Sequence, residues 1–159
     1  MTCTCRLLCR SMVVLILAGA PARAGSAVCT VATSGVAFGS FNPLPGQSAD
    51  TNGTIAVTCS GAPGDTASYT ITIGSGLGSF LSRKMLAGGD SLLYNLYKDS
   101  GCSQVWGDGS GGTSTVIDSV TLTSTSLTTN YVVYSRIAPG QNSARVHSYS
   151  DSLLVTIIY

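Results

Sequence analysis

Residues Asp151–Tyr159 read DSLLVTIIY, and after the first two positions Thr156 is the one residue that interrupts the apolar run before the final tyrosine. A strand with one face in water alternates apolar and polar residues, so this stretch predicts a strand over Ser152–Ile158 that needs cover on both faces. The sequence holds no later stretch that would pair with its free edge. A long apolar edge is an aggregation hazard unless another segment covers it. We therefore expect something external to complete this sheet.

The rest of the chain also reads as short strands, which predicts an all-β fold. Beyond the first 24 residues, no long segment repeats its apolar residues with the helical period, whereas short runs of alternating apolar and polar residues recur. Seven or eight such strands suit a β-sandwich. The expected strands are Val28–Ala32, Val36–Phe38, Thr54–Cys59, Ser68–Ile73, Leu92–Tyr97, Ser119–Thr123, Thr129–Ile137 and Ser152–Ile158.

Turn signals lie between these strands. They are Asn42-Pro43, Asn52-Gly53, Ala62-Pro63-Gly64, Gly88-Gly89-Asp90, Gly107-Asp108-Gly109 and Pro139-Gly140. Asn52-Gly53-Thr54 is also formally a glycosylation sequon. An Asn-Gly pair before a strand is first a signal for chain reversal, so we interpret this site as a turn.

The first 24 residues have the pattern of a secretory signal peptide. Arg6 and Arg10 precede the apolar run Met12–Ala20, and the small-residue tripeptide Ala22–Ala24 follows it. The apolar run is far shorter than the roughly 20 residues that a membrane-spanning helix needs. We therefore expect cleavage after Ala24, no retained membrane anchor, and one mature domain over residues 25–159.

The composition of the mature chain excludes nucleic acid as a partner. Removal of the signal peptide leaves five basic residues against seven aspartates, and Arg83-Lys84 is the one adjacent basic pair. Binding to nucleic acid requires clustered Lys and Arg. The mature chain has no Glu, and Ser, Thr and Gly make up 56 of its 135 residues, which disfavours helices and suits strands and turns.

Three cysteines remain after the signal peptide, and disulfides are expected outside the cytosol. Three single pairings are possible, and we favour Cys29 with Cys59 because both lie in strand-like runs, AVCTVA and TIAVTC. Cys102 lies in a Gly-Ser-Asp loop. It is either a free thiol or one that forms an intermolecular bond.

No pattern in the sequence indicates a catalytic or cofactor site. His147 and Asp151 are the residues available to a serine triad, but they lie on one segment and no GxSxG motif accompanies them. The GxGxxG pattern over Gly107–Gly112 is followed by strand-like residues rather than by a helix, so we interpret it as a hairpin loop. We expect no enzyme activity, no cofactor and no multi-histidine metal site. A calcium site remains open as an alternative, with Asp99, Asp108 or Asp118 as ligands.

The order of motifs resembles a known family. The motifs are CTV, VAFGSFNPL, GTIAVTC, YTITI, RKML, LLYNLYKD, VWGDG, APGQ and YSDSLLVTIIY. From Cys29 to Tyr159 the chain resembles the spore coat protein U domain family, which is similar to the pilins of archaic chaperone-usher fimbriae. The resemblance implies an immunoglobulin-like, pilin-type sandwich that lacks its final strand, and a Cys29–Cys59 bridge between early strands.

The resemblance also implies partners and a location. A periplasmic chaperone lends the missing strand first, and a neighbouring subunit then replaces it at the outer-membrane usher. The groove for that strand would be formed by Leu153, Val155, Ile157 and Tyr159. The chain would be exported through the periplasm to a surface fimbria or coat, with roles in attachment and biofilm.

Three features depart from the family pattern. His147 and Ser135 stand where Gly is usual, which leaves local details open. Only Gly25–Val28 would precede Cys29 after cleavage, whereas a donor strand needs on the order of 10 residues. We therefore expect a subunit that accepts a strand but does not provide one, either at a fibre tip or in a coat that assembles differently.

A self-contained adhesin or binding module is the alternative function. In that case Trp106 and Tyr97 would contact the ligand through the loops. For both aromatic residues, however, we favour packing in the core over contact with a ligand.

Overall fold

The computed structural model describes residues 27–43 and 46–159, so the predicted signal peptide lies outside the described residues. These residues form eight strands and no helix, and so none of them belongs to a helix that could span a membrane. The strands are β1 (Val28–Thr33), β2 (Ala49–Ser60), β3 (Thr66–Ile73), β4 (Arg83–Ala87), β5 (Asp90–Tyr97), β6 (Val116–Thr121), β7 (Ser126–Ile137) and β8 (Val155–Ile158).

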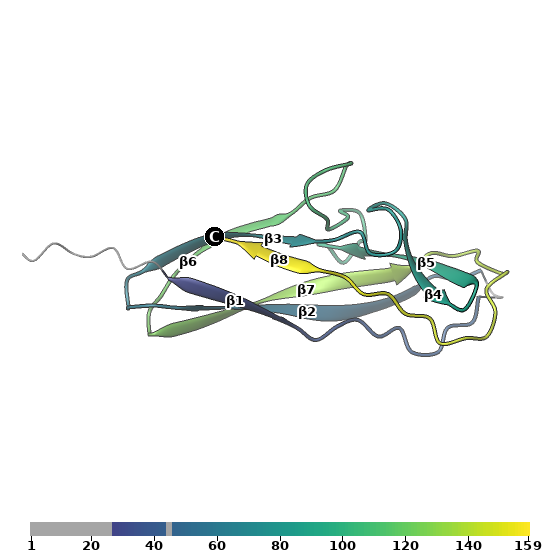
Figure 1. Ribbon diagram of the computed structural model, residues 1–159, viewed down its shortest axis with the longest axis horizontal. Helices are drawn as coiled ribbons and strands as arrows, with labels where there is room; N and C mark the ends of the chain where they lie inside the picture. The colour runs from purple at the N-terminus through teal and green to yellow at the C-terminus, as the bar shows by residue number, and fades with distance from the viewer. Residues whose placement is uncertain (1–26, 44–45) are drawn as a thin grey trace, which may run out of the picture.

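The strands form two sheets, which confirms the predicted all-β sandwich. One sheet has the order β1-β2-β7-β5-β4, and the other has the order β6-β3-β8. All strand pairs are antiparallel, and β2 and β7 pair along their full length. In Figure 1 the sandwich is elongated, with the β4–β5 hairpin at one end and the end of the chain toward the other. Each sheet buries one face against the other sheet, as its alternating residues require.

The core consists of the inward-facing residues of both sheets. Ile55, Val57 and Cys59 of β2 face Tyr69, Ile71 and Ile73 of β3, and all six are buried. Cys29 and Cys59 are direct neighbours in the β1–β2 ladder and form the predicted disulfide. The bond therefore fastens the edge strand β1 to its inner neighbour β2 in the larger sheet.

Two sequence predictions in this region are wrong. Val36–Phe38 is not a strand, because it lacks a regular ladder and is held in part by the Thr51 hydroxyl, which donates to the Ala37 carbonyl over 3.1 Å. Asn52-Gly53 is not a turn: it lies inside β2 and pairs with Tyr134 and Val133. The backbone at Gly35 passes so close to Gly53 that a Cβ at position 53 would collide with the carbonyl oxygen of Gly35. Position 53 therefore requires glycine.

Strand β4 is not among the strands predicted from the sequence. Its sequence, RKMLA, has no β-branched residue and therefore little intrinsic strand preference. Tertiary context forms the strand instead: the predicted turn at Gly88-Gly89 is present, with Gly88 at a φ of 59°, and it folds β4 back onto β5. The two strands make the hairpin at one end of the larger sheet.

Removing the disulfide tests how much the Cys29–Cys59 bond contributes to the fold. It closes a segment of 30 residues, so the chain-entropy model gives a contribution of roughly 3–4 kcal/mol. We expect a Cys29→Ala/Cys59→Ala variant to lose about that much free energy of unfolding in urea. A loss below about 1 kcal/mol would contradict this estimate.

Removal of the Ser135 hydroxyl is expected to stabilise the fold, whereas removal of the disulfide destabilises it. Its side chain is buried in β7, and its hydroxyl has no hydrogen-bond partner among the described residues. An unsatisfied buried hydroxyl costs about 1–3 kcal/mol. We expect Ser135→Ala to raise the melting temperature, while Ser68→Ala, which removes an exposed hydroxyl bonded to Ser119, does not. A lower melting temperature for Ser135→Ala would show that the hydroxyl is satisfied.

Candidate functional site

Strand β8 presents alternating faces at the edge of the smaller sheet. Leu153, Val155 and Ile157 are half-buried and pack against the core, as the sequence analysis expected. Tyr159 is 58% exposed and does not line the groove described below. Of the four predicted groove residues, Leu153 and Val155 therefore line the groove, whereas Ile157 faces inward but is not part of its lining.

One backbone edge of β8 is open. β8 pairs with β3 and with no other strand of the described chain. The amide of Gly74 donates to the carbonyl of Leu154 over 2.9 Å. Because hydrogen-bonded pairs alternate along an antiparallel ladder, the N–H and C=O groups of Val155 and Ile157 point away from β3. These groups are available to another strand.

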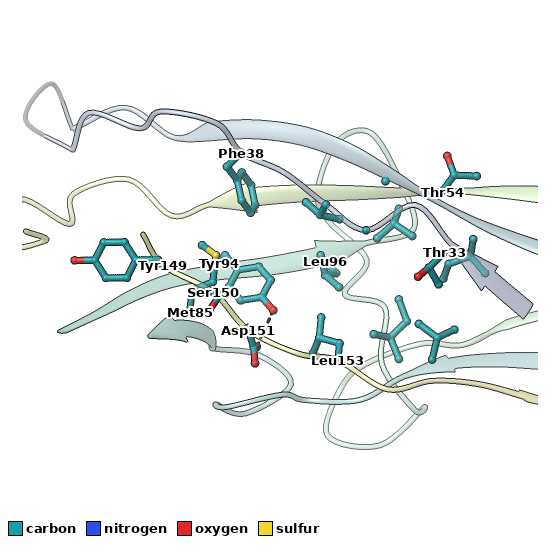
Figure 2. Close-up of a pocket in the computed structure, with 17 residues that line it drawn as sticks. Thr33, Phe38, Thr54, Met85, Tyr94, Leu96, Tyr149, Ser150, Asp151 and Leu153 are labelled. Carbon is teal, nitrogen blue, oxygen red and sulfur yellow. Dashed lines mark hydrogen bonds between the residues drawn. The ribbon is translucent and has the colours of Figure 1, made fainter. Parts of the chain in front are cut away.

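A groove lies beside this open edge. It contains a cavity of about 290 Å³, roughly twice the size of an apolar cavity of about 150 Å³ that holds benzene. Figure 2 shows that its walls come from the segment after β1, from β5 and from the segment that enters β8. Its apolar lining residues are Val36, Phe38, Ile55, Ile73, Met85, Leu96, Val133, Leu153 and Val155.

The wall opposite β8 is the segment that follows β1. Val36 and Phe38 face the groove, and the Phe38 ring meets Tyr94 edge-on at 6.1 Å between centroids. β1 is an edge of the larger sheet and lies against β8 farther along. The groove therefore runs between the edges of the two sheets, where a sandwich of this kind would place one more strand.

One end of the groove is closed by backbone pairing. The amide of Leu86 donates to the Ser150 carbonyl, and the amide of Ser150 donates to the Leu86 carbonyl, over 2.9 and 3.1 Å. These bonds join β4 to the segment that enters β8. An added strand would therefore have to end near Asp151.

Asp151 fixes the start of the terminal stretch. Its carboxylate accepts the Tyr94 hydroxyl over 2.8 Å and the amides of Leu77 and Ser152 over 3.3 and 2.8 Å. Burial, followed by the Asp151 carboxylate, raises the pKa of Tyr94 well above its ordinary value, because both disfavour a phenolate. Asp151 is an anchor rather than a member of a catalytic triad with His147, whose ring pairs with Asp90 at 3.1 Å.

Arg83 and Trp106 hold the loops behind the groove. Arg83 is fully buried, and it donates to the carbonyls of Gly74 and Trp106 over 2.8 Å each and to the Asn95 side chain over 2.6 Å. Trp106 is 1% exposed, and its indole N–H donates to the Ile71 carbonyl over 3.1 Å. The ring of Trp106 is therefore part of the core, which is the interpretation favoured from the sequence, and it is not placed to contact a ligand. No sequence pattern indicated that Arg83 would be buried.

The other predicted residues lie apart from the groove. Tyr97 is half-exposed at the end of β5, where it pairs with Tyr134. Cys102 is half-buried with a free thiol. Asp99 and Asp108 each bind groups of their own loops, and within residues 27–43 and 46–159 no three acidic, His or Cys side chains gather as metal ligands.

Alkaline unfolding tests the raised pKa of two tyrosines that are buried or half-buried. Burial and a neighbouring carboxylate raise the pKa of both Tyr94 and Tyr131 in the folded chain. Below the ordinary tyrosine pKa of about 10, both tyrosines are neutral in the folded and in the unfolded chain, so their full contribution to stability is present. Above that pH the tyrosines of the unfolded chain ionise first, so the free energy of unfolding falls as pH rises. We expect Tyr94→Phe to make the decline in unfolding free energy between pH 9 and 11 shallower. An unchanged slope would contradict the raised pKa.

Comparisons with known proteins agree with this fold. The model of the Spore Coat Protein U domain family matches residues 21–156. Among solved structures, the chain is similar to one from the CsuC–CsuE chaperone–tip adhesion subunit pre-assembly complex of the archaic chaperone-usher Csu pili of Acinetobacter baumannii, with a TM-score of 0.59 and 18% identity. The match covers 84% of this chain and 40% of that chain, so the chain spans two fifths of its length. No curated protein matches.

Proposed function

The chain belongs to the Spore Coat Protein U domain family, and we propose that it is a structural subunit of a surface fimbria or coat that is assembled by accepting a strand from a partner. The open edge of β8 beside an apolar groove is the observation that carries this proposal. Exposed N–H and C=O groups supply affinity for an added strand, and the pockets beside them supply specificity.

The size and lining of the groove support a peptide strand as its occupant. The cavity accepts large apolar side chains, and its two walls are the edges of different sheets. A strand between them would gain backbone hydrogen bonds to β8 and bury its apolar face on the core. A small molecule would leave the β8 backbone groups unpaired.

The partners and their order are those that the family resemblance implies. A periplasmic chaperone would supply the strand while the subunit is in transit, and a strand from a neighbouring subunit would replace it at an outer-membrane usher. The chain would then reside at the cell surface.

Charged substitutions on the two walls of the groove test this proposal. Leu153 and Val36 are half-buried on opposite walls, so Leu153→Asp and Val36→Asp would each place a carboxylate where the partner inserts apolar side chains. We expect either change to reduce recovery of a complex with the co-expressed periplasmic chaperone at least tenfold. Leu81→Asp, at an exposed position outside the groove, is the control and should leave recovery unchanged.

Circular dichroism of each variant separates lost binding from lost folding. A folded Leu153→Asp or Val36→Asp variant that still binds the chaperone as tightly as the unsubstituted chain would overturn the proposal.

A further inference from the structure

The outward face of β8 is apolar as well as the inward one. Leu154 is 74% exposed and Ile158 is 60% exposed, while Thr156 lies between them on the same face. The groove accounts for the inward residues alone. The groove therefore does not explain why two large aliphatic side chains are exposed at the edge of the sheet.

The sheet around these two residues carries no charge. Ile158 lies beside Thr70 of β3, Thr156 lies beside Thr72, and Leu154 lies beside Gly74. Thr70 also lies beside Ile117 of β6, on the side away from Ile158, and Ile117 is 78% exposed. A charged side chain added next to β8 would therefore find no opposite charge among the outward-facing strand residues of this sheet.

Strand geometry decides what would cover Leu154 and Ile158. A strand that pairs with the open edge of β8 directs alternate side chains outward, and those opposite β8 residues lie about 5 Å from them. Leu154 and Ile158 are four residues apart, so their neighbours on the added strand are also four residues apart. This holds for a parallel and for an antiparallel strand.

We propose that the partner strand is apolar on both faces: it fills the groove with one row of side chains and covers Leu154 and Ile158 with two outward aliphatic or aromatic residues at positions i and i+4. This inference rests on the proposed function and specifies the chemistry of the partner. An amphipathic strand with polar outward residues would fill the groove but leave both side chains in water.

Two synthetic peptides of equal length distinguish these cases. Both carry the same alternating apolar residues for the groove; one has Leu at the two outward positions and the other has Ser. Binding to the refolded mature chain is measured by titration calorimetry. Two apolar cross-strand pairs are expected to make the Leu peptide bind roughly five- to tenfold more tightly.

Matched variants of the chain identify where the preference arises. Leu154→Ser/Ile158→Ser should abolish the difference between the two peptides, while Ile117→Ser, which removes an exposed aliphatic residue from the same face across β3, should preserve it. Equal affinity of both peptides for the unsubstituted chain would overturn the inference, and so would loss of the preference in Ile117→Ser. If neither peptide binds, the proposed function is overturned as well.

Discussion

Unpaired backbone groups along one side of β8 are the constraint on which the rest of this structure depends. A sheet edge must be covered, charged or shortened if it is not to attract another strand. The opposite edge of the smaller sheet, β6, carries Asp118 among its inward-facing residues, and the Tyr131 hydroxyl donates to its carboxylate over 2.5 Å. β8 carries no charge between Val155 and Ile158. The two edges therefore differ in the feature that discourages strand addition.

The surrounding structure keeps this edge in place without covering it. The disulfide fastens β1 to β2 on one side of the groove. On the other side, Asp151 binds Tyr94 and the loop at Leu77, and Arg83 ties that loop region to Trp106. The carbonyl groups of Gly74 and Trp106 accept hydrogen bonds from the buried Arg83 guanidinium. These bonds stabilise loop backbone that lies outside the strand ladders. The groove is thus an opening in an otherwise braced sandwich.

The sequence predicted the sandwich, the disulfide and the inward row of β8, because period-two patterning and paired strand-like cysteines are local signals. It failed where tertiary contact decides. Asn52-Gly53 reads as a turn, but the glycine serves the close passage of Gly35 over β2. β4 forms through its hairpin despite weak strand preference. Trp106 cannot be distinguished from a surface aromatic until the loops that bury it are placed.

Amide hydrogen exchange along β8 tests most directly whether this edge accepts a strand. In the free chain, the amides of Val155 and Ile157 should exchange much faster than those of Thr156 and Ile158, which face β3. In the complex with a complementing strand, all four amides should be protected. If Val155 and Ile157 are already protected in the free chain, or stay unprotected in the complex, the open edge is not where the partner binds.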